Sequence, residues 1–210
     1  MPSEAESKPE STVSNEPRNR FMVWVDGVGG YLVCADKLNS IGQSTERNDV
    51  SIPICGDIHQ LHANIESSDS GHLIHPMGPV SIRNEPVVDS RLLIHNGTFE
   101  MGDSVSLRYA KPHPWSVTAV ISFESHNRTH PWSDGVLIAG DTIILGPANQ
   151  SHIHCNRWEH EVILLRRDGG WRCRSFADFQ IDGQAVDLEG KLELNSRVEG
   201  RDFSFSLEVI

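Results

Sequence analysis

Short runs in which apolar and polar residues alternate are the feature that most limits what this chain can fold into. They recur from Phe21 to Ile210, are rich in Val, Ile, Leu and Phe, and are separated by Gly, Asn, Asp and Pro. A period of two residues places apolar side chains on one face of a strand. No window of about 11 residues carries the helical period. The sequence therefore predicts an all-β protein of the kind that forms sandwiches.

The composition indicates a folded protein that follows a polar tail. Hydrophobic residues make up 38% of the chain and charged residues 22%, values typical of globular domains. Residues 1–19 are rich in Ser, Glu, Pro and Asn, which predicts a disordered tail. The sequence lacks both a signal-peptide core and an apolar segment of the ~18 residues that a membrane helix needs. We expect a cytoplasmic protein with no membrane partner.

The net charge limits the classes of partner, and the setting of the cysteines limits the chemistry expected of them. The formal net charge is −11 and no basic run occurs, which argues against DNA or RNA as a partner. The four cysteines, Cys34, Cys55, Cys155 and Cys173, are widely spaced among mostly apolar residues. That setting favours buried, reduced thiols over disulfides or a metal site.

Internal similarity predicts two copies of one β-module. Three pairs of segments match in the same order, with offsets of about 100 residues: 26–33 with 134–141, 81–88 with 180–187, and 102–109 with 201–209. The second pair aligns Ile82 with Ile181, and the third aligns Leu107 with Leu207. We expect module 1 over residues 20–111 and module 2 over residues 112–210. The short segment between them predicts that the modules pack together.

Module 1 contains five short motifs in a fixed order. They are "IGQ" at 41–43, "NDV" at 48–50, "HQLHANI" at 59–65, "PVSIRNE" at 79–85 and "FEMGDSVSL" at 99–107. Over residues 22–110 this order resembles the forkhead-associated (FHA) domain, a β-sandwich that binds phosphothreonine peptides through loops at one end. The residues that keep the structural part of the family pattern are Gly42, Asn48, Asp49, His62, Gly102 and Asp103.

The phosphate-reading part of the family pattern is altered. In the family, a loop arginine and a serine contact the phosphate, because a guanidinium and a hydroxyl match its oxygens. In this chain Gln43 replaces that arginine, and His59 and Gln60 replace a Ser-Arg pair of the family pattern. Arg47 and Arg83 are the candidates to compensate, and the alternative is that both are solvated loop charges. The full set of candidate phosphopeptide-binding residues is Gln43, Arg47, His59, Gln60, Ser81, Arg83 and Asn84.

Module 2 resembles the same family more weakly, over residues 116–210. Pro147 takes the arginine position after "IILG", and His160 is the candidate for the motif histidine. Asp182 and Gly183 keep a turn between two strands. We expect this copy to have a structural role or to make a different contact.

Other chemistry is poorly supported by the sequence. His152, His154, Cys155 and His160 are acceptable zinc ligands, but a strand would turn Cys155 away from the first two histidines. No enzyme motif occurs, so we expect no catalytic residue, no metal and no cofactor. Trp115 and Trp132, each in a His-Pro-Trp tripeptide, are expected to pack between the modules, with an exposed aromatic groove as the alternative.

These features together predict a non-catalytic protein-interaction protein. The FHA resemblance implies a partner protein phosphorylated on threonine, within Ser/Thr kinase signalling. Two alternatives stay open. One is a scaffold or oligomerisation protein that binds without phosphate, and the other is a metal-binding β protein that uses the histidine-rich segment at 151–160.

Overall fold

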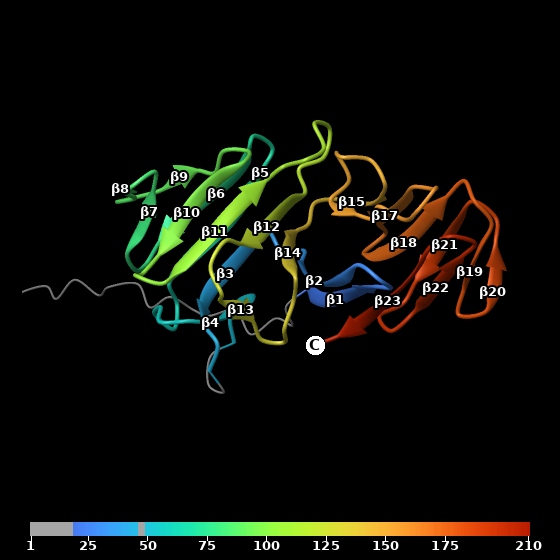
Figure 1. The fold of residues 1–210 in the computed structure, drawn as a ribbon, viewed down its shortest axis with the longest axis horizontal. Coiled ribbons are helices and arrows are strands. Elements are labelled where there is room, and N and C mark those ends of the chain that lie inside the picture. Colours follow the sequence, from blue (N-terminus) through green and yellow to red (C-terminus); the bar gives the residue numbers. More distant parts are fainter. Residues whose placement is uncertain (1–18, 46–48) are drawn as a thin grey trace, which may run out of the picture.

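A computed structural model describes residues 19–45 and 49–210, and all regular structure in these ranges is β-strand. This confirms the all-β prediction. In these ranges no helix has the length and apolar character that crossing a membrane requires. The strands form three sheets, arranged as two lobes that lie side by side (Figure 1).

The largest sheet, called here the shared sheet, has 12 strands and runs through both lobes. In spatial order its strands are β20 (Gln184–Val186), β19 (Phe179–Ile181), β22 (Arg197–Gly200), β23 (Ser204–Val209), β1 (Arg20–Val25), β2 (Gly29–Cys34), β14 (Gly135–Ile138), β12 (Ala119–Phe123), β11 (Val105–Ala110), β10 (Gly97–Met101), β7 (Val80–Ile82) and β8 (Glu85–Pro86).

Two smaller sheets form the second layer of the lobes. The first cover sheet is ordered β13 (Arg128–Thr129), β4 (Ile52–Cys55), β3 (Leu38–Gln43), β5 (Ala63–Ser68), β6 (Gly71–Pro76) and β9 (Arg91–Leu92). The second cover sheet is ordered β16 (Ile153–His154), β15 (Thr142–Gly146), β17 (Val162–Arg167), β18 (Gly170–Ser175) and β21 (Glu189–Leu192). We call β3–β14 the first lobe, and β1, β2 and β15–β23 the second lobe.

The strand order is the same when it is read outward from the centre of the shared sheet in either direction. From β14 the order is β12, β11, β10, β7 and β8, and from β2 it is β1, β23, β22, β19 and β20. The cover sheets also match, because β4, β3, β5, β6 and β9 correspond to β16, β15, β17, β18 and β21. The two lobes therefore repeat one arrangement of strands.

Each lobe contains strands from the module that was expected to form the other lobe. β1 and β2 of the second lobe belong to expected module 1, and β12–β14 of the first lobe belong to expected module 2. β1 and β2 precede β3 in the chain, yet β1 pairs with β23 at the far end of the sequence. β12 follows β11 through a short loop and pairs with it. β2 and β14 then pair in parallel and join the lobes. The module boundary between residues 111 and 112 stays a prediction. In each lobe, strands from both expected modules are hydrogen-bonded to each other.

The three central strands are buried on both faces. Along β1, Phe21, Val23 and Val25 lie in the core of the second lobe, whereas Met22 lies in the core of the first. β2 and β14 alternate in the same way, with Leu137 of β14 in the second core. Because successive side chains of a strand point to opposite faces, one strand can supply two cores.

Strand pairing tests the sequence matches directly. Ile82 and Ile181 each close a hairpin, opposite Glu85 and Gln184 respectively, so the match of residues 81–88 with 180–187 is confirmed. The ladder Ile82–Phe99–Leu107 corresponds to Ile181–Val198–Phe205. Leu107 is therefore equivalent to Phe205 and not to Leu207. The two-residue offset keeps the apolar residues on one face, which is why alternation alone did not fix it.

The expectation for two tryptophans was wrong. Trp115 is 91% exposed and Trp132 is 51% exposed, so neither ring packs between the lobes. The centre of the molecule is filled instead by the aliphatic residues of β2 and β14. All four cysteines are free. Cys34, Cys155 and Cys173 are buried as expected, whereas Cys55 is exposed.

Candidate functional site

His62 ties together the loops at one end of the first lobe. Its side chain is fully buried, its Nδ1 accepts the backbone N–H of His59 at 3.0 Å, and its Nε2 lies 2.8 Å from the carbonyl oxygen of Pro79. Since Nδ1 accepts, Nε2 carries the proton and donates to Pro79. Burial is the main cause that lowers the pKa of His62, so the neutral ring is favoured. His62 thus joins the β4–β5 loop to the β6–β7 loop.

Backbone hydrogen bonds reinforce this connection. The N–H groups of Met77 and Gly78 both donate to the carbonyl oxygen of His62, and the N–H of Gly102 donates to that of Pro79. The three loops 56–62, 77–79 and 102–104 are therefore held as one unit. We call this unit the clamped end of the first lobe.

Two glycines of the clamped end are needed for close approach. A Cβ on Gly78 would lie 2.8 Å from ring atoms of both His59 and His62. Gly102 has a φ of +57°, and a Cβ there would lie 2.9 Å from the carbonyl oxygen of Asp57. Any other residue would push these loops apart.

Several residues of the FHA-like pattern meet at the clamped end. Gly42 is buried at the end of β3, next to Gln43, whose N–H donates to the carbonyl oxygen of His59. The side-chain amide of Gln43 donates to the carbonyl oxygen of Gly56 at 3.3 Å. His59 and Gln60 are exposed on the β4–β5 loop. Gln43 thus supports a neighbouring loop through its side chain.

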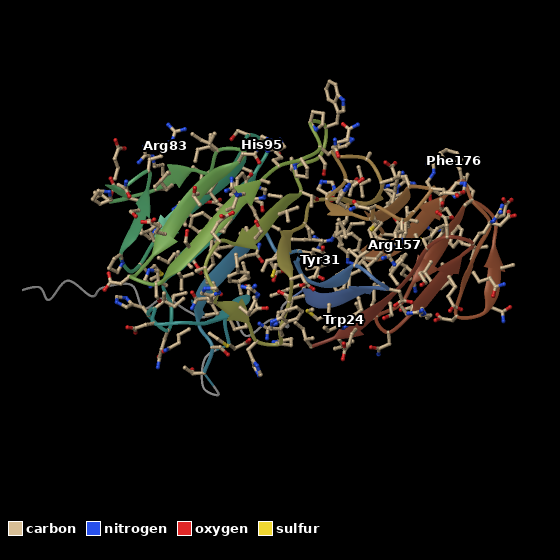
Figure 2. All side chains as sticks on the ribbon, viewed as in Figure 1. Trp24, Tyr31, Arg83, His95, Arg157 and Phe176 are labelled. Atoms are coloured by element: carbon tan, nitrogen blue, oxygen red, sulfur yellow. The ribbon has the colours of Figure 1, made fainter. Side chains whose placement is uncertain are left out.

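The structure does not bring Ser81, Arg83 and Asn84 to the clamped end. Ser81 lies in the middle of β7 and donates to Glu100 at 3.0 Å. Arg83 and Asn84 form the turn after β7, both with positive φ. The start of β7 adjoins the clamped end, and three strand residues span roughly 10 Å, so this turn lies at the opposite end of the strand. Figure 2 shows Arg83 at the upper left, away from β3 and β4 in Figure 1.

The remaining predicted residues have separate positions. Asp103 is exposed in the turn between β10 and β11, directly after Gly102. Asp49 is exposed and forms an ion pair with Arg20 at 3.3 Å, and Arg20 also donates to the carbonyl oxygen of Val50. Arg47 and Asn48 lie outside the described residues.

Sequence reasoning missed the contribution of backbone carbonyls and of exposed apolar side chains. Pro79 accepts from both His62 and Gly102 through its carbonyl oxygen, and such a role leaves no mark on side-chain identity. Leu61 and Met77 flank His62 and are exposed, with Met77 at 55%. Their apolar character next to a motif histidine was the one signal available for them.

The matching end of the second lobe is held by a carboxylate. Asp202, in the β22–β23 turn, accepts the N–H groups of Glu159 and His160 and lies 2.8 Å from Nδ1 of His160. Burial opposes the charged form, but these hydrogen bonds outweigh it and lower the pKa of Asp202. Since Ala63 and Val162 hold equivalent positions opposite Ile41 and Leu145, Glu161 is the equivalent of His62. His160 therefore lies one residue before the motif position.

The histidine-rich segment of the second lobe is divided among different partners. His152 is buried and its Nδ1 accepts from the N–H of Ile144, whereas His154 is exposed beside the carbonyl oxygen of Ala148. Burial raises the pKa of Cys155 to about 12, which favours the neutral thiol. Across residues 19–45 and 49–210, no group of three or more His, Cys, Asp or Glu side chains is placed to hold a metal ion.

Two sandwich lobes that share one continuous sheet define an all-β architecture. Comparisons with known proteins find similarity among solved structures. No family model matches the chain, and no curated protein matches it. A solved structure described as the N-terminal FHA domain of EssC, a component of the bacterial type VII secretion apparatus, aligns with 90% of this chain and 92% of its own. The identity is 11% and the TM-score is 0.26.

Proposed function

We propose that this chain is a non-catalytic protein-interaction protein whose partner contacts the clamped end of the first lobe. The observation that carries the proposal is the double hydrogen bond of His62, which fixes two loops to each other. Loops that are already fixed lose little conformational entropy when a partner binds. Binding residues also occur most often on loops held by a rigid scaffold.

The exposed residues of the clamped end suit a peptide or protein surface. Leu61 and Met77 offer apolar area, and His59 and Gln60 offer polar groups between them. A small apolar patch with a polar border is the usual composition of a protein-binding surface. A scaffold that binds without phosphate is consistent with these residues.

Phosphothreonine recognition is the finer form of the proposal, and it rests on the FHA resemblance. Arg47 is the arginine on which it depends, because Arg83 lies at the other end of β7. Arg20 is paired with Asp49 and the amide of Gln43 is bound to Gly56. A dianionic phosphate needs charge-assisted hydrogen bonds, which favour guanidinium donors.

The test is a random peptide library offered in threonine and phosphothreonine forms to the full chain. The Leu61→Ser/Met77→Ser variant should bind the selected peptides about tenfold more weakly, since each of the two side chains buries apolar area against the peptide. The matched control is Ile94→Ser, because Ile94 is equally exposed at 55% but lies beside Gly97, near Arg83. Equal binding by all three proteins, or no selected peptide, would contradict the proposal.

The same library separates the two forms of the proposal. A preference for phosphothreonine that Arg47→Ala abolishes and Arg83→Ala preserves would support phosphate recognition. Equal binding of both peptide forms would support phosphate-independent contact.

A further inference from the structure

The outward face of the second cover sheet carries four cations in an otherwise acidic protein. Arg167 on β17, Arg172 and Arg174 on β18, and Lys191 on β21 all alternate with buried residues and so point outward. We call these four residues the cationic face. The whole chain has a formal net charge of −11, so this concentration of positive charge is local.

The pairing register places the four cations in three successive rows. Arg174 lies between Ile163 and Glu189 in one row, and Arg172 lies between Leu165 and Lys191 in the next. Arg167 lies opposite Gly170 in the third. Rows that are two residues apart along a strand are separated by roughly 6.7 Å.

Carboxylates of the chain balance only part of this charge. Glu189 accepts from Nε of Arg172 at 2.5 Å and lies 4.0 Å from Arg167, and Lys191 pairs with Glu193. The hydrogen bond from Arg172 is the main cause that lowers the pKa of Glu189. Arg174 stacks over the ring of Phe176, with 5.6 Å between its Cζ and the ring centroid. The four cations thus form ion pairs with two carboxylates, Glu189 and Glu193, and Arg174 forms none of these pairs.

The fold itself does not require these cations. The equivalent positions in the first lobe are Ser68, Leu73, His75 and Leu92, because Ser68 pairs with Gly71, and Leu73 lies between Glu66 and Leu92. None of these is a lysine or an arginine, although the surrounding strands are the same. Arg172 and Lys191 lie directly opposite each other, an arrangement of like charges that costs stability. Local choices that oppose stability are typical of functional sites.

We propose that the cationic face binds an extended acidic segment of a partner protein. A strand-like peptide with Glu or Asp at every second position places carboxylates on one side at the spacing of the three rows. Guanidinium groups bind carboxylates through paired hydrogen bonds, and the half-buried Ile163 and Leu165 lie beside the same rows.

The boundaries of the surface follow from its neighbours. Beyond Arg174, a depression of about 180 Å³ is bordered by Glu159, Glu161 and Phe176. The two carboxylates there end the positive region, whereas Phe176 is 85% exposed and adds an apolar contact. Figure 2 shows Phe176 at the upper edge of the second lobe. This surface is separate from the clamped end of the first lobe and does not depend on the function proposed for it.

The test uses the full chain and labelled synthetic peptides in a fluorescence anisotropy titration. The probe peptide alternates Glu with Ser, and a second peptide of the same composition groups its Glu residues in one block. A third peptide carries Gln in place of Glu, and a single-stranded oligothymidine is the fourth probe. We expect the alternating peptide to bind best, and binding to weaken as salt is added.

Variants locate the binding. The Arg172→Gln/Arg174→Gln variant should bind the alternating peptide roughly tenfold more weakly, because each hydrogen bond that is lost involves charged groups. Arg83→Gln/Arg91→Gln in the first lobe removes the same charge and should leave binding unchanged. Leu73→Arg/His75→Arg transfers two cations to the equivalent face of the first lobe and should strengthen binding.

Three outcomes would overturn the proposal. Equal binding of the Gln peptide would exclude recognition of carboxylates, and equal weakening by both double variants would reduce the effect to net charge. Tighter binding of the oligothymidine than of every peptide would assign the face to nucleic acid.

Discussion

The two lobes hold their matching loops in different ways. In the first lobe, the buried ring of His62 joins the β4–β5 loop to the carbonyl oxygen of Pro79 in the β6–β7 loop. In the second lobe, Asp202 of the β22–β23 turn accepts from the backbone of the loop that contains His160. One arrangement of strands therefore accepts either a neutral imidazole or a carboxylate. The β4–β5 loop and its equivalent in the second lobe are thus joined to different neighbouring loops, so side chains decide both how this loop is fixed and which loop it is fixed to.

The largest expected effect tests whether the lobes are separable at all. Phe21→Ala should cost about 3–5 kcal/mol and Met22→Ala about 2–5 kcal/mol of unfolding free energy. These neighbours lie in different cores on one strand. We expect both variants to shift a single unfolding transition, measured by tryptophan fluorescence in urea. Two transitions, each moved by only one variant, would show that the lobes unfold independently.

A second test uses acid to compare the buried histidines of the two lobes. Burial lowers the pKa of His72 in the first lobe and of His152 in the second to about 4. An unfolded histidine has a pKa of about 6.5, so the unfolded chain binds more protons between these values. Stability is thus full above pH 6.5 and is lost as pH falls toward 4, by up to ~3 kcal/mol for each group.

The measurement is the urea midpoint between pH about 7 and 4. His72→Gln and His152→Gln should each flatten this dependence, and His154→Gln, at an exposed position, is the control. If the His154 variant flattens the curve as much as the buried ones, burial is not the cause.

A third test compares the two clamps. His62→Ala removes two hydrogen bonds of a buried ring and should cost about 2–3 kcal/mol, whereas Asp202→Ala should cost about 1 kcal/mol. Amide hydrogen exchange gives the sharper contrast. We expect faster exchange at Gly102 in the first variant only, and faster exchange at Glu159 in the second only. Spread of either effect to the other lobe would show that the clamped ends are coupled.

The smallest effects concern the outward faces of the cover sheets. Lys191→Leu and Leu92→Lys exchange the residue types at equivalent positions, and each should change stability by less than about 0.5 kcal/mol. Lys191→Leu should be neutral or slightly stabilising, because it removes the like-charge contact with Arg172. A loss of more than about 1 kcal/mol would mean that Lys191 has a structural role.

Much of the fold was predictable from alternation and turns. The strand pattern indicated an all-β chain, and the match around Ile82 and Ile181 identified the same hairpin in both lobes. The match at Leu107 was displaced by two residues, because alternate positions of a strand look alike in sequence. The exposure of Trp115 was also missed, because the sequence around an aromatic residue does not show whether other elements pack against it.

The candidate site was predictable only in part. The sequence pointed to His62 and Gly102, which the structure brings together through Pro79. It also grouped Arg83 with them, although that turn lies at the other end of β7. Position along the chain does not reveal which end of a short strand a turn occupies, because pairing direction depends on distant strands.

The sequence by itself determined the strand character of the chain, its internal repetition and the local turns, because these follow from side-chain period and backbone preference. Only the tertiary structure decided that β1 pairs with β23 and β12 with β11. Strand hairpins with similar apolar faces fit either lobe, so local sequence does not distinguish the two arrangements. The choice depends on which contacts close the shared sheet and bury both faces of β1, β2 and β14.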